Sequence, residues 1–282
     1  MKYFLIAILI IVLAVLALVY YLIYMPVDVK SEESVVFLVK KGEGLNQIAE
    51  NLKEQGLIKS KYSFIAYTLY KKQEKELIAG GYQLFYSMNI PEILKKISSG
   101  DRIKIMVTII EGWTIKDIEQ KLNMGLIDPS LEGYLFPDTY EIYLDDKLED
   151  IIKKMQDNFD KKITNEIRQE INSQQKSLEQ IIIMASILEK EVQTSEDKKI
   201  VSGILWKRIE MGMLLQVDAV PFTYEVKGLP PAPICNPGLL SIEAALYPIK
   251  SKYLYYLSTQ EGETIFSTTL AEHEDARQKY LK

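Results

Sequence analysis

The chain has only one cysteine, Cys235, and only one histidine, His273, among its 282 residues. A single cysteine excludes an intramolecular disulfide. Structural zinc sites take four ligands, mostly cysteine and histidine, so the sequence disfavours a zinc site built from this chain alone. A Cys–His nucleophile pair would need these two residues to meet through tertiary folding. We therefore expect no metal ion in this protein.

The chain also has fewer basic than acidic residues. The chain has 34 Lys and Arg against 39 Asp and Glu, which gives a formal net charge of −5 at pH 7. Because nucleic acids are bound mainly through Lys and Arg at the phosphate backbone, we expect no nucleic-acid partner. The other proportions, 48% hydrophobic and 26% charged residues, are those of a globular protein. A chain of this length forms one large domain or two ordinary ones.

Charged side chains are missing from residues 3–25. About 20 apolar residues are enough to cross the bilayer core, so we expect a transmembrane helix within residues 1–25. Lys2 precedes the run, and acidic residues outnumber lysine in the linker 26–33 that follows it. By the positive-inside rule, the N-terminus is then cytoplasmic and the rest of the chain lies outside the cell membrane. The alternative is a cleaved signal peptide, whose apolar region is usually shorter, about 7–15 residues.

The rest of the sequence divides at about residue 105. Its first strand, glycine turn and helix resemble the opening of a LysM module, a small glycan-binding fold. Residues 37–52 also align without gaps to residues 107–122, either as an internal repeat or as two unrelated units of one generic kind. We expect an α+β protein, with a LysM-like subdomain at 34–105 and a larger mixed α/β domain at 106–282.

In the second part, an apolar run at 181–188 passes directly into Glu189, Lys190 and Glu191. Ser177 is a suitable N-cap, so the run predicts a helix that ends in charge. At helical spacing, either glutamate extends a stripe of apolar side chains. A carboxyl group beside apolar surface has a raised pKa, which a general acid acting on a glycosidic oxygen requires. The alternative is that both glutamates belong to a solvated helix end.

Tyrosine is abundant, with 18 residues, and several aromatic residues lie with carboxylates in one segment of the second part. Aromatic rings stack on the apolar faces of sugars, whereas carboxylates and amides bind sugar hydroxyls. Glu132, Tyr134 and Asp138 are therefore candidates for binding a glycan. The alternative role, packing in the core and in turns, is the expectation for Phe136 and Tyr143.

Six segments resemble the MltG/YceG-like endolytic murein transglycosylases: EGYLFPDTY at 132–140, MASILEKE at 184–191, LLQVD at 214–218, GLPPAPICNPG at 228–238, AALYP at 244–248 and FSTTLAEH at 266–273. The resemblance extends over nearly all of the chain after the membrane span. It implies one anchoring helix, a LysM-like subdomain and a catalytic domain. It also implies cleavage inside peptidoglycan strands, between MurNAc and GlcNAc, leaving 1,6-anhydro ends. The catalytic glutamate of the family corresponds to Glu191.

The resemblance explains why one catalytic carboxylate is enough. Most glycosidases need two, but in a lytic transglycosylase the nucleophile is the C6 hydroxyl of the substrate. Glu191 would protonate the leaving oxygen and then accept the proton of that hydroxyl. We expect it in a groove lined by Tyr134 and residues 216–218. The predicted substrate-binding residues are Glu132, Tyr134, Asp138, Gln216, Asp218 and Asn236.

The family further implies peptidoglycan strands and peptidoglycan synthases as partners, and no cofactor. Residues 219–227 are shorter than the corresponding segment of relatives, which includes an Asn-Thr-Tyr element, and the Asn is missing here, so we expect a shortened cleft loop. Three other functions stay open: a non-catalytic peptidoglycan-binding anchor, a scaffold of the division machinery, and an aminodeoxychorismate lyase that uses pyridoxal phosphate. The lack of a glycine-rich phosphate loop disfavours the last of these.

Overall fold

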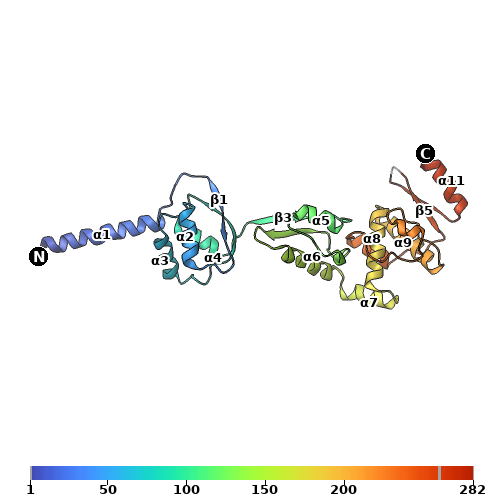
Figure 1. Ribbon diagram of the computed structural model, residues 1–282, viewed down its shortest axis with the longest axis horizontal. Coiled ribbons are helices and arrows are strands. Elements are labelled where there is room, and N and C mark those ends of the chain that lie inside the picture. Colours follow the sequence, from blue (N-terminus) through green and yellow to red (C-terminus); the bar gives the residue numbers. More distant parts are fainter. Residues whose placement is uncertain (1, 260–261, 282) are drawn as a thin grey trace. The chain divides into compact units, whose positions relative to one another are not determined.

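The computed structural model describes residues 2–259 and 262–281, and in this part of the chain the fold is mixed α+β, as expected (Figure 1). The chain separates into two compact units, each with its own buried core. The first unit consists of the residues up to 105 together with 141–146, and the second of residues 106–140 and those from 147 onward. The predicted domain limits stay a prediction.

The first unit contains a small antiparallel sheet and several helices. Its elements are α1 (Lys2–Tyr24), β1 (Ser34–Val39), α2 (Leu45–Glu54), α3 (Lys61–Lys71), β2 (Gly80–Phe85) and α4 (Ile90–Ser98). β1 and β2 pair along their whole length, with Ser34 opposite Phe85. Side chains of the sheet and of the short helices, including Phe37, Phe64 and Tyr82, are fully buried in its core. The LysM-like character of this unit stays a prediction.

Helix α1 is long and apolar enough to cross a membrane, judged by its length and composition, and none of its residues is buried. Its 23 residues span about 34 Å at 1.5 Å per residue, against about 30 Å for a bilayer core. The end of the helix contacts the rest of the first unit, where Ile23 packs against the core. Beyond the helix, Asp28 N donates to Tyr86 O at 3.1 Å.

The two segments that align in the sequence have the same order of elements. β1 leads through Gly42 into α2, and β3 (Lys104–Thr108) leads through Gly112 into α5 (Ile115–Leu122). The two glycines have φ of 88° and 80°, a region that other residues rarely adopt. The similarity therefore includes the backbone of the turn. The chain passes between the units three times: within β3, within β4 (Thr139–Tyr143), and between residues 146 and 147.

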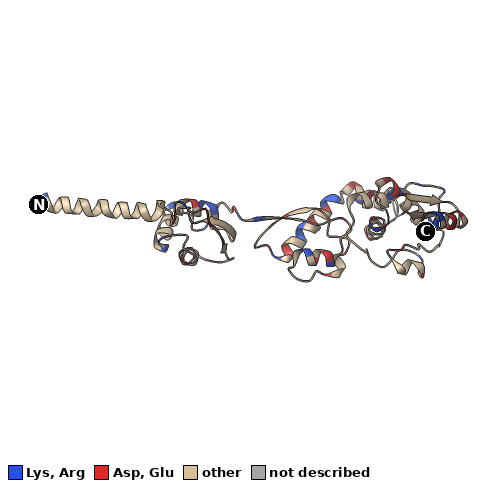
Figure 2. Ribbon diagram, turned by 90° about the horizontal axis from the view of Figure 1, so that it is seen from above, with Lys and Arg blue, Asp and Glu red and all other residues tan. Residues whose placement is uncertain are grey.

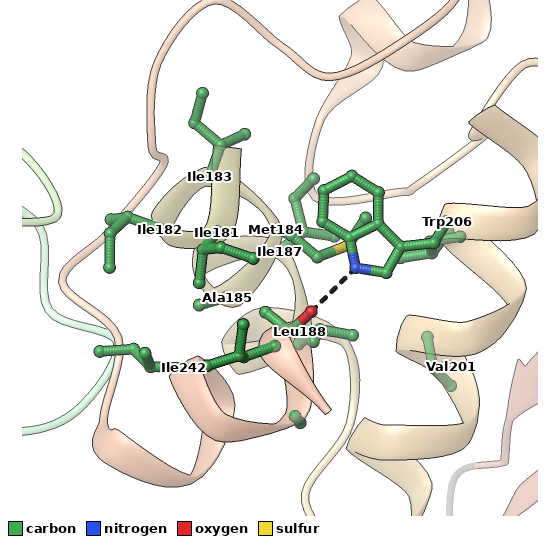
Figure 3. Close-up of a cluster of buried hydrophobic side chains, with 14 of the residues drawn as sticks. Ile181, Ile182, Ile183, Met184, Ala185, Ile187, Leu188, Val201, Trp206 and Ile242 are labelled. Carbon is green, nitrogen blue, oxygen red and sulfur yellow. Dashed lines mark hydrogen bonds between the residues drawn. The ribbon is translucent and has the colours of Figure 1, made fainter. Parts of the chain in front are cut away.

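The second unit is built around helix α8 (Leu178–Glu191). Its other elements are α5, η1 (Pro129–Leu131), α6 (Leu148–Lys162), α7 (Asn165–Ser173), α9 (Ser195–Glu210), η2 (Pro221–Tyr224), α10 (Leu239–Leu246), β5 (Tyr255–Ser258), β6 (Thr264–Ser267) and α11 (Leu270–Tyr280). Helices α9 and α10 pack along α8. Trp206 of α9 donates its Nε1–H to Ala245 O of α10 at 2.9 Å, which joins the two helices (Figure 3).

Helix α8 begins at a capping box in which Ser177 and Gln180 each bond the other's backbone N–H. Every residue from 181 to 188 is buried, because neighbouring elements cover the helix on several sides (Figure 3). Full burial of one such aliphatic side chain contributes about 1.5–3 kcal/mol. The helix ends at Glu191, and Val192 continues in an extended conformation. The terminal glutamates are therefore attached to the core of the unit.

Candidate active site

The side chain of Glu189 is largely covered and lies at the N-terminal end of α10. Its Oε2 accepts hydrogen bonds from Gly238 N at 2.9 Å and Ser241 Oγ at 2.6 Å, and its Oε1 accepts one from Lys198 Nζ at 3.0 Å. The side chains of Lys198 and Glu189 are only 6% and 9% exposed. Burial acts to raise the pKa of Glu189, but the bonds from Ser241, Gly238 and Lys198 outweigh it and the pKa is lowered. Glu189 is thus an ionised group that ties α8 to α9 and α10.

Glu191 lies on another side of the same helix end, because residues two apart on an α-helix point about 200° apart. Its Oε1 accepts a hydrogen bond from Ala219 N at 3.3 Å, and its Oε2 accepts one from Tyr256 OH at 3.1 Å. Ser258 Oγ donates to the backbone oxygen of Glu191 at 3.3 Å. The loop after α9 and strand β5 therefore both hold this partly buried residue.

The pKa of Glu191 is raised, in contrast to that of Glu189. Burial is the largest cause, and the negative charge of Asp218 adds to it. The hydrogen bonds from Ala219 and Tyr256 act in the opposite direction but do not compensate for the burial. Glu191 therefore holds its proton to a higher pH than an exposed glutamate. A carboxyl group in this state can give a proton to a leaving group and take one back.

The loop that contacts Glu191 is held by Thr223. Its buried Oγ1 accepts a hydrogen bond from Val217 N at 2.9 Å, and its backbone oxygen accepts one from Gln216 N at 3.1 Å. Gln216 has a φ of 53°, a left-handed conformation that costs a non-glycine residue about 1–3 kcal/mol. These bonds keep the exposed side chains of Gln216 and Asp218 on the loop next to Glu191.

Asp218 also has a partner of its own on this loop. The Tyr224 hydroxyl donates to Asp218 Oδ1, and this bond together with burial raises the pKa of Tyr224 to about 12. Tyr224 therefore stays protonated at neutral pH and fixes the position of the Asp218 carboxylate. The negative charge of Asp218, which adds to the effect of burial in raising the pKa of Glu191, is therefore held in a fixed position.

Asn236 cannot make the predicted substrate contact, because it is fully buried and its amide is used within the chain. Its Oδ1 accepts from Gly133 N at 2.9 Å and from Leu135 N at 3.0 Å. Its Nδ2 donates to Trp113 O and to Glu132 Oε1, both at 3.0 Å. Asn236 therefore joins distant segments of the second unit to one another.

Two of the predicted acidic residues are also bonded within the chain. Glu132 accepts a hydrogen bond from Ile115 N, the first residue of α5, at 3.0 Å. Burial raises the pKa of Glu132, although this bond acts against the rise. Asp138 is exposed and accepts bonds from Asn158 Nδ2 at 3.0 Å and Thr139 N at 2.8 Å, which lower its pKa. Its side-chain partner is on α6, not at the end of α8.

Tyr134 does not lie with Glu191 as predicted. Its ring packs edge-on against Phe159, with centroids 5.4 Å apart. Burial raises its pKa, and the charge of Glu179 adds to the rise. The neighbouring Gly133 lies against Ile182, in the first half of α8, since a Cβ added to it would be 2.7 Å from Ile182 Cγ2. Glu179 precedes Glu191 by twelve residues, or about 18 Å along the helix. The structure therefore brings residues 216–218 to Glu191 but leaves Tyr134 near the other end of the helix.

Sequence reasoning did not single out Tyr256, Lys198 or Ser241. For Lys198 a signal was available, because it shares one helical face with Val201 and Leu205, both fully buried. A lysine at such a position predicts a buried ion pair. Tyr256 lies in a four-residue strand that also contains Tyr255, and so short an alternation does not tell which tyrosine faces the helix.

The lone cysteine and the lone histidine both pack against other residues of the chain. Cys235 is fully buried, its Sγ donates to Ser186 O at 3.4 Å, and burial raises its pKa to about 12. A thiol with that pKa is not a nucleophile at neutral pH. The His273 ring stacks on Tyr255 with centroids 5.5 Å apart. Within residues 2–259 and 262–281, no group of three or more His, Cys, Asp or Glu is arranged to hold a metal ion.

Comparisons with known proteins match most of the chain. A model of the YceG-like family matches residues 37–221 and 222–279. The chain is 30% identical to the endolytic murein transglycosylase of Bacillus subtilis (strain 168), over 91% of this chain and 87% of that protein. It is 25% identical to the endolytic murein transglycosylase of Streptococcus pneumoniae serotype 2 (strain D39), over 89% of this chain and 59% of that protein. A crystal structure of a putative yceG-like protein from Listeria monocytogenes is 29% identical, with a TM-score of 0.55, and covers 87% of this chain and 100% of that one.

The fold and the site define a mixed α+β protein in which the buried helix α8 ends at a half-buried glutamate with a raised pKa. This glutamate, Glu191, is hydrogen-bonded to the loop after α9 and to strand β5. These structural features and the sequence matches point to the same family. The chain belongs to the YceG-like family.

Proposed function

We propose that the chain is a membrane-anchored lytic transglycosylase. It cuts peptidoglycan strands internally at the β-1,4 bond between MurNAc and GlcNAc, leaves 1,6-anhydroMurNAc ends, and so helps to terminate the elongation of nascent strands. The observation that carries the proposal is Glu191, whose pKa is raised and whose two oxygens accept bonds from Ala219 and Tyr256. The names of the relatives, endolytic murein transglycosylases, support the same activity.

In the proposed cycle Glu191 starts protonated. Its proton passes to the glycosidic oxygen, O4 of GlcNAc, as the bond from this oxygen to C1 of MurNAc breaks. The C6 hydroxyl of the same MurNAc bonds to C1 and gives its proton to the Glu191 carboxylate, which restores the acid. The N-acetyl group of the substrate stabilises the positive charge at C1. No water is consumed, and one carboxyl group is both acid and base.

The neighbours of Glu191 have distinct parts in this cycle. Ala219 and Tyr256 are positioning groups, and each Glu191 oxygen keeps a lone pair free beyond the bond it accepts. Burial raises the pKa of Glu191, and the charge of Asp218 adds to the rise. We further propose that Gln216 and Asp218, both exposed on the same loop, bind sugar hydroxyls. The shortened loop would leave these contacts with fewer supporting residues than in relatives.

The proposed topology has α1 in the cell membrane, the N-terminus in the cytoplasm and the residues from about 30 onward outside. The length and composition of α1 support a single span, and Lys2 lies on the expected cytoplasmic side. In this location the substrate is the peptidoglycan next to the membrane. Peptidoglycan synthases, which produce the strands, are the proposed protein partners.

The test is incubation of the full chain with purified sacculi, followed by mass spectrometry of the released anhydro-muropeptides. Glu191→Gln keeps the shape of the side chain but cannot transfer the proton. One general acid or base contributes about 10²–10⁴-fold to the rate, and we expect the upper end because one residue has both parts. Glu196→Gln is the matched control, since Glu196 is exposed in the first turn of α9 and should remain active.

Two results would contradict the proposal. If Glu191→Gln released anhydro-muropeptides at the wild-type rate, the acid would be elsewhere. If the wild-type chain bound sacculi but released no anhydro products, the non-catalytic anchor would be the better description.

A further inference from the structure

Helix α3 carries an exposed aromatic and apolar stripe that the proposed activity does not use. Tyr62 is 73% exposed, Leu69 52% and Tyr70 78%, and Ala66 is exposed between them. Their spacing places these four residues on one side of the helix. The core of the first unit takes the opposite side, where Phe64 is fully buried. Large apolar side chains gathered on a surface mark a site of interaction.

The same segment is positively charged, although the chain as a whole carries a net charge of −5. Residues 55–73 contain no Asp or Glu, and their charged residues are Lys59, Lys61, Lys71 and Lys72. Lys61 forms an ion pair with Glu50, whereas the other three form none with the part of the chain that the structure describes. Glu54 and Glu74 border this segment in the sequence. The positive charge next to the stripe that has no ion pair within the described residues is therefore that of Lys59, Lys71 and Lys72, and it is suited to a negatively charged surface.

Contacts within the first unit hold α3 against the end of α1. Lys59, just before α3, donates to Met25 O at 2.9 Å, and its Nζ lies 3.8 Å from the centroid of the Tyr21 ring. Tyr24 meets Tyr67 of α3 edge-on, with centroids 6.2 Å apart. Figure 1 shows α3 beside this end of α1. Figure 2 shows that α1 has no charged residue between its N-terminus and this region.

We propose that this face of α3, formed by Tyr62, Ala66, Leu69 and Tyr70 and surrounded by lysines, lies on an anionic lipid surface. The proposal rests on the proposed membrane span of α1. A span that ends at Tyr24 places that residue at the level of the lipid headgroups, where tyrosine is enriched. Because α3 is bonded to this end of α1, its exposed side meets the same leaflet.

The physical contributions are those of an interfacial amphipathic helix. Tyrosine and leucine side chains enter the boundary between headgroups and acyl chains, while lysines attract anionic headgroups. Docking would give the first unit a second membrane contact besides α1. With two contacts, the first unit can no longer tilt freely relative to the membrane plane.

The experiment uses the full chain reconstituted in vesicles of phosphatidylcholine, with and without phosphatidylglycerol. An environment-sensitive fluorophore is attached at Ala66→Cys, which leaves the three large side chains of the face intact, and a quencher is carried on the lipid tails. Cys235 stays in place because it is fully buried. Val12→Cys, within α1, is the positive control, and Gln83→Cys, exposed on β2, is the negative control.

We expect the lipid-borne quencher to act on the label at residue 66 in vesicles with phosphatidylglycerol, as at residue 12, but not on that at residue 83. Lys71→Gln and Lys72→Gln should each lower the ratio of docked to undocked chains about fivefold, from about 1 kcal/mol per lysine. If neither lysine substitution changed the ratio of docked to undocked chains, the proposal would be overturned.

The remaining outcomes separate the docking from the anchoring. If the label at residue 12 is quenched while that at residue 66 behaves like residue 83, the anchor holds and the docking is refuted. If the label at residue 12 is not quenched, the proposed span itself is refuted, and the docking with it. If the emission at residue 66 shifts to the blue without lipid quenching, a second copy or another protein surface covers the face, and a lipid surface is excluded.

Discussion

Replacing Glu189 by glutamine should destabilise the second unit, although the change exchanges only one oxygen for an amide nitrogen. The carboxylate faces three donors, on Lys198, Ser241 and Gly238. The glutamine side chain would offer one oxygen, and its NH₂ would face at least one of these donors without forming a bond. The Lys198 ammonium would also lose its counter-charge while remaining 6% exposed.

The magnitude follows from the burial of the pair. Removing one partner of a buried ion pair costs about 3–5 kcal/mol, because the other charge stays buried. For a unit of 150–250 residues, 1 kcal/mol corresponds to about 2–4 °C, so the melting temperature should fall by about 6–20 °C. Glu191→Gln should change it far less, because Ala219 N can still donate to the amide oxygen and the Tyr256 hydroxyl can turn to accept from the amide NH₂. One substitution thus affects stability and the other activity.

The assay is calorimetry of the full chain at neutral pH, with release of anhydro-muropeptides measured on the same samples. Because the pKa of Glu189 is lowered by folding, its contribution to stability is present above its unfolded pKa and is lost as the pH falls through the folded pKa. The melts of wild type and Glu189→Gln should therefore converge in acid. Lys198→Met added to Glu189→Gln should restore stability, since neither charge then remains.

A wild-type melting temperature for Glu189→Gln would refute this reasoning. So would a double variant no more stable than the single one, because the loss would then not come from the unpaired lysine.

Further predictions concern the pH profile and the helix packing. Asp218→Asn removes a charge that raises the pKa of Glu191, so the alkaline decline of activity should move to lower pH in a pH–rate profile. Tyr256→Phe removes a hydrogen bond that lowers this pKa, so the decline should move to higher pH; a shift opposite to the expected one in either variant would contradict the statement made for it. Gly203→Ala would place its Cβ 2.1 Å from Ile249 O, and overpacking of this kind costs about 1–3 kcal/mol, measurable by urea unfolding. Unchanged stability would mean that the backbone at Ile249 moves away freely.

The frame of the site could be predicted from local sequence. Ser177 with Gln180 marks the start of α8, and the structure has the capping box there. The apolar run at 181–188 predicted a helix, and every residue of the run is buried in α8. Gly212, with a φ of 66°, is a similar local signal just after the end of α9. These features depend on residues within one or two helical turns of one another, which is the range over which capping and periodicity operate.

The groups that distinguish the two glutamates could not be predicted in this way. Ala219 is 28 residues from Glu191 and Tyr256 is 65 residues from it, so their contacts arise only from tertiary packing. The motif around Asn236 was visible in the sequence, but a motif does not tell whether a side chain faces a ligand or the chain itself. The same applies to Tyr134, whose ring packs on a helix instead of lining a cleft near Glu191.

The late position of β5 has a consequence for biosynthesis. A ribosome adds residues in order, so Tyr256 and Ser258 are made 65 and 67 residues after Glu191. Until this strand emerges, the carboxyl group lacks the hydroxyl that orients it and part of the protein that buries it. A product of interrupted translation that ended before β5 would contain the glutamate without its tyrosine partner. The order of the chain therefore delays completion of the site around Glu191 until β5 has been made.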